Sequence, residues 1–304
     1  MKKILVTGGA GFLGSHLCEK LLNLNNYVIC LDNYYTGKKE NIIKFIEKNN
    51  FKFVYHDINK YYYENIDEIY NLACPASPIH YQQNPIQTLK TCINGALNVL
   101  ELALKTNAKV LQASTSEIYG DPKIEPQSES YWGNVNPVGV RSCYDEGKRC
   151  AETLFFDYYR QYNILIKVVR IFNTYGPRMS IDDGRVVSNF ITQSLQNKPL
   201  TIYGKGDHLR CFCYVDDLID GLIKMMDTQD QTIGPINLGS NQIFSMNELA
   251  DKIIKLTKSD SKKIFLKLPD NDPKSRKPNL ELAKIKLNWS SKTNIDEGLD
   301  LTIK

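Results

Sequence analysis

The sequence predicts an α/β fold, in which a doubly wound parallel sheet is followed by a smaller C-terminal α/β lobe. Three observations carry this prediction. Short apolar runs alternate with helix-length segments as far as Phe172, as is typical of parallel strands joined by crossover helices. A glycine-rich turn directly follows the first apolar run. Beyond Phe172 the alternation gives way to loops and short strands.

This alternation assigns the elements in order. The apolar runs predict strands at residues 3–7, 27–32, 51–57, 68–73, 108–114 and 165–172. The longer segments between them predict helices at residues 12–24, 85–107 and 144–162. In the C-terminal part, short strands are expected in "PLTIYG", in "CFCYV" and at 264–268, with a short helix at 280–287. Ser245 and Glu248 match a capping box, which predicts a helix ending near Thr257.

Composition narrows the classes of function. The net charge of the 304 residues is only +4, so we expect no basic surface for nucleic acid or membranes. No apolar run reaches the roughly 18 residues of a membrane span. The first strand is predicted to begin at Lys3, so we expect no targeting peptide before it. The eight cysteines are scattered, so we expect reduced thiols in a cytoplasmic protein. Cys211 and Cys213 are expected to pack in the core rather than bind a metal.

The glycine-rich turn "VTGGAGFLG" predicts a dinucleotide site. The spacing of Gly8, Gly11 and Gly14 allows a tight turn, a close approach of the backbone to a pyrophosphate, and close packing of the next helix. Asp32 ends the second strand, where an acid binds the adenosine ribose hydroxyls and repels a 2′-phosphate. NAD is therefore the expected cofactor, with NADP as the alternative that Lys38 leaves open.

Two further motifs predict chemistry beside that site. "ASTSEIYGD" places Glu117 just past the end of the fifth strand, at the sheet edge where doubly wound folds bind ligands. "YDEGK" places Tyr144 and Lys148 four residues apart, on one face of a helix. A lysine ammonium lowers the pKa of a nearby phenol, so Tyr144 is a candidate base.

Together these motifs resemble the extended short-chain dehydrogenase/reductases that act on nucleotide sugars. Within that family the chain is most similar to the UDP-glucuronate decarboxylases, also called UDP-xylose synthases, and the resemblance covers essentially the whole length. Its most specific segments are "NLACPASPIHYQQNPIQTLKT", "ASTSEIYGDP", "YDEGKR", "RIFNTYGPRM", "DGRVVSNFI" and "DPKSRKP".

The resemblance implies roles for the matching residues. Thr115 would hydrogen-bond the C4 hydroxyl of the sugar, and Tyr144 would take its proton as hydride passes to NAD. Lys148 would hold the nicotinamide ribose, Glu117 would lie near C5, and Arg276 would lie near the uronate carboxylate. The other residues implied in NAD binding are Gly8, Gly11, Phe12, Leu13, Asp32, Asn33, Thr36, Gly37, Asp57, Ile58, Leu72 and Ala73. Those implied in substrate binding are Pro75, Tyr81, Asn173, Arg178, Arg185, Tyr203 and Arg210.

The implied reaction requires no metal. Oxidation of C4 of a hexuronate gives a β-keto acid, which loses carbon dioxide through an enolate. C5 is then protonated, and the same NADH reduces the C4 ketone, so the cofactor is expected to stay tightly bound. A guanidinium recognises a planar carboxylate with two hydrogen bonds, which suits Arg276 better than a lysine. The product could be UDP-xylose or, without the final reduction, a 4-keto pentose.

Departures from the family leave alternatives open. Cys92 stands where the family usually has Asn, Asn94 replaces an aliphatic residue, and Asn279 stands where Asp is common. A nucleotide-sugar 4,6-dehydratase would share Glu117, whereas a 4-epimerase usually has a small neutral residue there. A catalytically silent NAD(H)-sensing protein typically lacks the Tyr or the Lys of the "YDEGK" motif.

The sequence also predicts a homodimer and a division of the chain into two domains. The helices at 85–107 and 144–162 carry apolar residues beyond one core face, and by resemblance they would pair with a second subunit in a homodimer. We expect residues 1–172 with 205–235 to form an NAD-binding Rossmann domain. Residues 173–204 with 236–304 are expected to form the UDP-sugar lobe.

Overall fold

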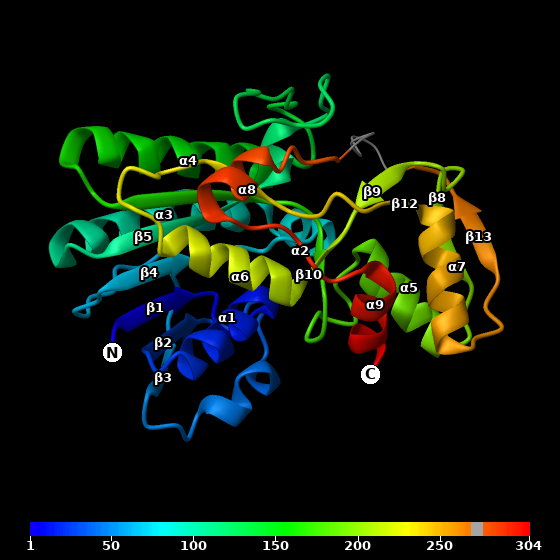
Figure 1. Cartoon of the computed structure of the whole chain (residues 1–304), viewed down its shortest axis with the longest axis horizontal. Helices are drawn as coiled ribbons and strands as arrows, with labels where there is room; N and C mark the ends of the chain where they lie inside the picture. The colour runs from blue at the N-terminus through cyan, green and yellow to red at the C-terminus, as the bar shows by residue number, and fades with distance from the viewer. Residues whose placement is uncertain (269–275) are drawn as a thin grey trace.

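A parallel sheet of seven strands dominates the computed structural model, which describes residues 1–268 and 276–304 (Figure 1). The strand order is β11-β6-β5-β4-β1-β2-β3, so the chain winds outward from β1 in both directions. These strands are β1 (Lys3–Thr7), β2 (Tyr27–Asp32), β3 (Phe51–Tyr55), β4 (Glu68–Asn71), β5 (Lys109–Thr115), β6 (Ile166–Ile171) and β11 (Ile236–Leu238). The predicted fold class, a doubly wound parallel sheet, is confirmed.

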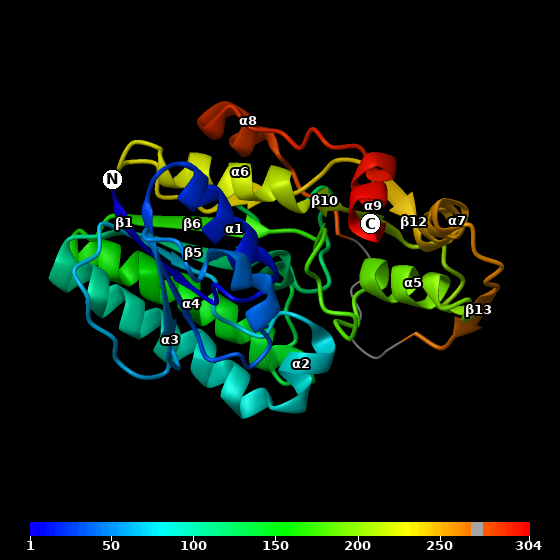
Figure 2. The ribbon, with the colours of Figure 1, turned by 90° about the horizontal axis from the view of Figure 1, so that it is seen from below.

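Helices cover both faces of this sheet. Figure 2 shows α3 (Pro85–Thr106) and α4 (Ser142–Tyr162) side by side on one face, with α1 (Phe12–Asn23) and α6 (Val215–Met226) on the other. Successive side chains of a strand point to opposite faces. Ile4 and Val6 therefore pack in the α1/α6 layer, and Leu5 packs in the α3/α4 layer. Burial on both sides explains why the strands appear as continuous apolar runs in the sequence.

A smaller lobe adjoins the carboxyl edge of the sheet (Figure 1). Its paired strands are β7 (Thr174–Tyr175) with β10 (Cys213–Tyr214), β8 (Leu200–Tyr203) with β13 (Lys263–Leu266), and β9 (Leu209–Cys211) with β12 (Ile243–Ser245). The helices of the C-terminal part are α5 (Val186–Leu195), α7 (Met246–Thr257), α8 (Glu281–Leu287) and α9 (Ile295–Ile303). The predicted capping box is confirmed, because the Ser245 hydroxyl accepts the Glu248 amide at 3.1 Å and the Glu248 carboxylate accepts the Ser245 amide at 2.8 Å.

Several elements lie outside the predicted set. They are β7, β11, β12, α6, α9, the short α2 (Pro78–Gln83), and the single turns η1 (Lys39–Asn41), η2 (Ile43–Phe45) and η3 (Ser116–Tyr119). The strand β11 joins the main sheet from a segment that the predicted division gave to the smaller lobe, and that division stays a prediction. The first four residues of "DPKSRKP" lie outside the described residues.

Two expectations from composition can be compared with the structure. Cys211 and Cys213 are buried, as expected of core residues. No helix in the described part of the chain combines the length and the apolar character that crossing a bilayer requires.

Candidate functional site

A cavity of about 670 Å³ opens at the carboxyl ends of the central strands, between the sheet and the smaller lobe. Apart from Gly37, all the residues predicted for the catalytic, cofactor and substrate sets line it. Gly37 lies behind the wall, where a Cβ atom would be 3.0 Å from both carboxylate oxygens of Asp32. Residues from distant parts of the chain therefore meet around one space.

The glycine-rich turn is shaped as a dinucleotide cradle. Gly8 has a φ of +68°, and its amide donates to the Leu31 carbonyl at 2.8 Å. A Cβ atom on Gly14 would lie 2.1 Å from the Gly8 carbonyl oxygen, so only glycine allows the helix this close. Gly11 caps the N-terminus of α1, where free amides favour an anion. These features fit a bound pyrophosphate.

Asp32 lies at the end of β2, beside this cradle. Its carboxylate accepts the amides of Ala10 at 3.0 Å and Tyr34 at 2.7 Å, which hold it in place at the cavity wall. Burial raises the pKa of Asp32 above its usual value. The position fits the ribose end of a dinucleotide.

Thr115, Tyr144 and Lys148 meet where β5 ends against α4. Thr115 lies close enough to Tyr144 to lower the pKa of its phenol, and the Thr115 hydroxyl accepts the Glu117 amide at 3.2 Å. The Lys148 Nζ lies 5.8 Å from the centre of the Tyr144 ring and donates to the Ala113 carbonyl at 2.9 Å. Burial raises the pKa of Tyr144 well above its usual value, so the lowering expected from Lys148 is wrong for this structure. Desolvation of the phenol is the larger effect.

A second tyrosine covers the first. The rings of Tyr81 and Tyr144 stack with their centres 4.9 Å apart and their planes 6° from parallel. The Tyr81 hydroxyl is buried and has no hydrogen-bond partner among the described residues. A ligand in the cavity could take this hydrogen bond.

Glu117 is held between two arginines. Arg276 binds its carboxylate with two hydrogen bonds, Nε to Oε1 at 3.0 Å and Nη2 to Oε2 at 2.7 Å. Arg141 forms a second ion pair with Oε2. The Arg276 Nη1 also donates to the Gly120 carbonyl at 2.7 Å, which ties the arginine to the turn that carries Glu117. Glu117 and Arg276, predicted as separate contacts to a sugar, thus contact each other.

The two guanidiniums set the charge of this cluster. Burial alone would raise the pKa of Glu117, but Arg276 and Arg141 lower it to about 2, so the carboxylate is ionised at neutral pH. Asp145 lies on the same helix turn as Tyr144, and burial together with the Glu117 charge raises its pKa to about 7. Its Oδ1 atom is buried without a hydrogen-bond partner in the described part of the chain.

Sequence reasoning missed Arg141 and Asp145. The helix α4 begins at Ser142 rather than at Tyr144, so the Arg141 carbonyl accepts the amides of Tyr144 at 3.0 Å and Asp145 at 3.1 Å. That first turn brings the Arg141 guanidinium to Glu117. The signal was present in "RSCYDEGK", where Arg141 precedes Tyr144 by three residues and hence shares its side of the helix.

Three of the arginines predicted to bind the substrate, Arg178, Arg185 and Arg210, have partners in the protein. Arg185 binds Asp183 through Nε at 2.5 Å and Nη2 at 2.7 Å. Arg178 pairs with Glu19 of α1. Arg210 lies beside Arg276 in a short bridge between β9 and the segment after residue 275. The remaining predicted substrate contacts, Pro75, Asn173 and Tyr203, line the same cavity.

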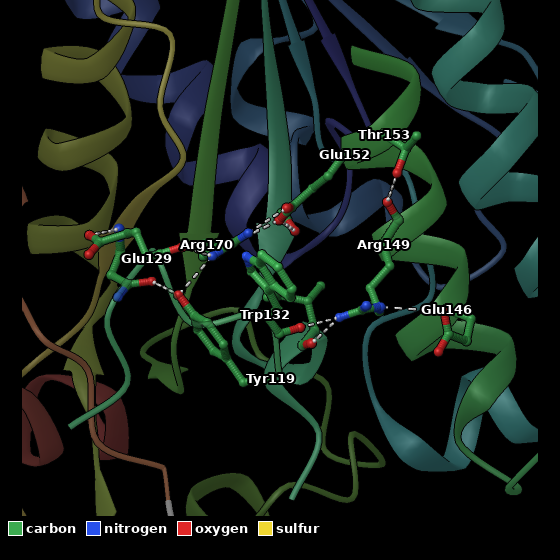
Figure 3. A network of polar contacts seen from close by, with 11 residues as sticks. Tyr119, Glu129, Trp132, Glu146, Arg149, Glu152, Thr153 and Arg170 are labelled. Atoms are coloured by element: carbon green, nitrogen blue, oxygen red, sulfur yellow. Dashed lines mark hydrogen bonds and ion pairs between the residues drawn. The ribbon is translucent and has the colours of Figure 1, made fainter. Parts of the chain in front are cut away.

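A buried polar network supports this site from behind (Figure 3). Arg170 binds the Glu152 carboxylate through Nε at 3.0 Å and Nη2 at 2.8 Å, and donates to the Tyr119 hydroxyl at 3.0 Å. Arg149 donates to the carbonyls of Ile118 at 3.0 Å and Trp132 at 2.7 Å. Since Ile118 and Tyr119 belong to η3, the network fixes the turn that presents Glu117.

Metal ligands are not grouped in the described part of the chain, where no three His, Cys, Asp or Glu side chains are placed to hold an ion. The arrangement instead supplies a dinucleotide cradle, a Thr–Tyr–Lys group and a carboxylate with two arginines.

Known proteins share this chain's sequence and fold. The profile of the NAD dependent epimerase/dehydratase family matches residues 4–239. UDP-glucuronic acid decarboxylase 6 of Arabidopsis thaliana is 54% identical over 98% of this chain and 87% of its own length. UDP-glucuronic acid decarboxylase 1 of Xenopus tropicalis is 49% identical over 99% of this chain and 71% of its own. The solved UDP-glucuronic acid 4-epimerase of Bacillus cereus, with UDP-glucuronic acid and NAD, has a TM-score of 0.89 and 30% identity, covering 99% of this chain and 98% of that one.

Proposed function

The chain belongs to the NAD-dependent epimerase/dehydratase family, and from that premise we propose that it decarboxylates UDP-glucuronate to UDP-xylose with NAD as cofactor. The observation that carries the proposal is the ion-paired cluster of Glu117, Arg276 and Arg141 at the cavity, next to Thr115 and Tyr144. Identities of 49–54% to decarboxylases over nearly the whole chain support the same reaction.

The cradle and the Thr–Tyr–Lys group account for the oxidation and reduction at C4. A bound NAD would supply the acceptor for the C4 hydride and the donor that returns it. The glycine-rich turn and Asp32 would hold the cofactor, and Lys148 would hold its nicotinamide ribose. Tyr144 takes the proton of the C4 hydroxyl as a phenolate, which the positive charges of Lys148 and of bound NAD would stabilise against the effect of burial, and Thr115 lies beside it. The same phenol returns that proton when the ketone is reduced.

Arg276 accounts for recognition of the uronate. The guanidinium already forms two parallel hydrogen bonds with a carboxylate, that of Glu117. The carboxylate of the substrate offers the same geometry and competes for the same donors. Because Arg141 stays on Glu117, the glutamate is not left as an unpaired buried charge during this exchange.

The exchange also prepares Glu117 for its proposed role near C5. Two guanidiniums hold its pKa at about 2. Once Arg276 turns to the substrate, one positive neighbour is lost and the pKa of Glu117 rises. A carboxyl group with a higher pKa is better suited to handle the proton that C5 takes up after carbon dioxide leaves.

Assembly and compartment are parts of the same proposal. The helices α3 and α4 carry exposed apolar side chains, including Ile86, Leu89 and Tyr162, which support a homodimer formed through this pair of helices. The free thiols of all eight cysteines support a reducing compartment, for which we propose the cytoplasm. Light scattering after size-exclusion chromatography measures the oligomeric state directly.

Incubation with UDP-glucuronate and NAD tests the reaction. We expect release of carbon dioxide and a UDP-pentose, identified by mass spectrometry and NMR. Tyr144→Phe should lose this activity, and unchanged turnover in that variant would contradict the mechanism. A 4-keto-6-deoxy product from a neutral hexose nucleotide, without carbon dioxide from UDP-glucuronate, would identify a dehydratase. A C4 epimer of UDP-glucuronate without carbon dioxide would identify an epimerase.

A further inference from the structure

Two cysteines meet beside the cofactor side of the cavity. Cys74 lies on the loop after β4 and lines the cavity, whereas Cys92 lies within α3 and is only 4% exposed. Their sulfur atoms are 3.3 Å apart. A disulfide bond is about 2.05 Å long, so the two sulfurs need to approach by only about 1.2 Å to be joined.

The surroundings make the two thiols chemically unequal. The hydrogen bond from Cys92 and the charge of Lys148 lower the pKa of Cys74, although burial acts in the opposite direction. The hydrogen bond with Cys74 and burial raise the pKa of Cys92. Because the thiolate is the nucleophile, Cys74 is the thiol that reacts first with an oxidant in the cavity. Cys92, protonated and in contact, is placed to react second.

The other close thiol pair of the chain lacks this access. Cys18 and Cys30 also neighbour each other, but both are completely buried under the sheet and neither lines the cavity. Cys143 is a third thiol near the first pair, and its Sγ atom donates to the Tyr81 carbonyl at 3.5 Å. It therefore has to be tested as an alternative partner.

We infer that Cys74 and Cys92 form a reversible disulfide on exposure to hydrogen peroxide, and that this bond weakens binding of the nicotinamide cofactor. The Cys74 thiolate attacks one peroxide oxygen, which gives a sulfenic acid and hydroxide. The Cys92 sulfur then attacks the Cys74 sulfur, and the sulfenic oxygen leaves as water when it takes up a proton. In sum, one peroxide and two thiols give one disulfide and two water molecules.

The structure links this bond to the cofactor site. Leu72 and Ala73, which precede Cys74 directly, line the cavity, and a Cβ atom on Gly8 would lie 2.9 Å from the Ala73 backbone. On the other side, a Cβ atom on Gly147 would lie 3.0 Å from the Cys92 Sγ. Joining the sulfurs therefore shifts the loop relative to the glycine cradle and changes the contact of Cys92 with α4 between Tyr144 and Lys148.

Peroxide treatment followed by non-reducing peptide mapping tests the bond itself. We expect a peptide pair linked through Cys74 and Cys92, two hydrogens lighter than the separate peptides and absent after dithiothreitol. Cys92→Ser should give no such pair, and Cys92→Asn is a second variant if the first folds poorly. Cys150→Ser, on the half-exposed surface of α4, is the matched control and should form the link as the unmodified chain does. A link from Cys74 to Cys143, or none at all, would overturn the inference.

NADH fluorescence titration tests the consequence without any turnover. The loss of one hydrogen bond to a charged group weakens binding by roughly tenfold or more, so we expect peroxide to weaken NADH binding by at least that factor. Dithiothreitol should restore the affinity, and Cys92→Ser should keep it throughout. Equal loss of affinity in Cys92→Ser, or unchanged affinity in the linked protein, would overturn the inference. Both measurements are independent of which sugar the enzyme uses.

Discussion

Two glutamates of this molecule, Glu117 and Glu152, are bound by arginine at similar depth, and they differ in what lies beside them. The Glu117 side chain is 16% exposed and the Glu152 side chain is 11% exposed. Arg276 and Arg170 each grip one of them with two hydrogen bonds. Glu117 faces the cavity, whereas Glu152 lies in the network behind the sheet edge, which Figure 3 shows.

The two glutamates differ in the number of arginines that bind them. Glu152 also accepts the Ser114 hydroxyl at 2.5 Å, so its oxygens are bound by neutral and charged donors from adjoining strands and never meet a ligand. Glu117 has a second guanidinium, that of Arg141, which makes Arg276 replaceable. A buried ion pair adds little net stability to the fold, but removing one partner is strongly destabilising because it leaves an unpaired buried charge. An ion pair with a spare partner can be exchanged for a substrate.

Removing the charge of Glu152, the glutamate outside the cavity, should give the largest loss of folding free energy. Glu152→Gln leaves Arg170 buried without its counter-ion, and losing one partner of such a pair costs about 3–5 kcal/mol of folding free energy. Urea unfolding followed by circular dichroism measures this loss. Glu146→Gln is the matched control, since Glu146 forms only a half-exposed pair with Arg149 on the same helix, at 3.4 Å. A control variant that is destabilised as much as Glu152→Gln would contradict the contrast.

Glu117→Gln should lower the activity strongly and the folding stability less than Glu152→Gln does. We expect carbon dioxide release to fall by about 10²-fold or more, since a proton-handling carboxyl contributes 10²–10⁴-fold. The free energy of unfolding should change less than in Glu152→Gln, because Arg141 and Arg276 line the cavity whereas Arg170 lies outside it. Turnover with UDP-glucuronate and urea unfolding, done on the same preparations, give both quantities. Full activity in a destabilised Glu117→Gln protein would place Glu117 with the structural glutamates.

The contrast between the two glutamates was only half visible in the sequence. Glu117 stood out because it follows an apolar strand directly, where a carboxylate needs a reason to be. Glu152 was hidden inside a helix of mixed composition, and Arg170 inside an apolar strand, so neither pattern indicated a buried pair. Ion pairs between distant segments depend on tertiary packing, which local periodicity does not encode.

The same limit applies to the fold and to the rest of the site. Long periodic elements such as α3 and the capped helix α7 were predicted within one residue of their ends. The three-residue strand β11 was missed, because it is too short to show a period and is defined by pairing with β6. The resemblance to a family indicated which residues share the cavity, but it did not indicate that Arg276 would bind Glu117 or that burial would raise the pKa of Tyr144.

Asp145 should make the folding stability fall as the pH rises toward neutrality. Its folded pKa of about 7 lies above the usual 3.8, so the folded state binds an extra proton between these values. This group's contribution to stability is therefore complete below about pH 4 and is lost as the pH rises to about 7, by at most about 1.4 kcal/mol per pH unit. Glu117, with a pKa lowered from 4.5 to about 2, has the opposite sign, and its contribution is lost as the pH falls from about 4.5 to about 2.

Asp145→Asn isolates this contribution. The difference in unfolding free energy between the variant and the unmodified chain should favour the variant increasingly from pH 5 to about pH 7 and should level off above that. Asp157→Asn is the control, because Asp157 lies on the exposed surface of the same helix beside Arg160 and should show no such trend. A pH-independent difference in Asp145→Asn would show that its carboxyl keeps an ordinary pKa.

Substitution of Arg141 should give the smallest loss of activity. It directly tests whether Arg141 keeps Glu117 paired while Arg276 binds the substrate. Arg141→Gln removes one of the two charges that hold the pKa of Glu117 low, so that pKa should rise, and the acid limb of the kcat profile should move to higher pH. We expect kcat to fall by about tenfold, or about 1.4 kcal/mol, with little change in KM, because Arg141 positions Glu117 rather than the substrate. Arg141→Lys keeps the charge but loses the planar fork, so it should restore the pH profile more than the rate. Arg160→Lys, on the exposed surface of α4, should change neither the pH profile nor the rate.

A rise in KM with an unshifted acid limb would mean that Arg141 binds the substrate itself. Glu117 would then have no second partner to keep it paired when Arg276 binds the substrate.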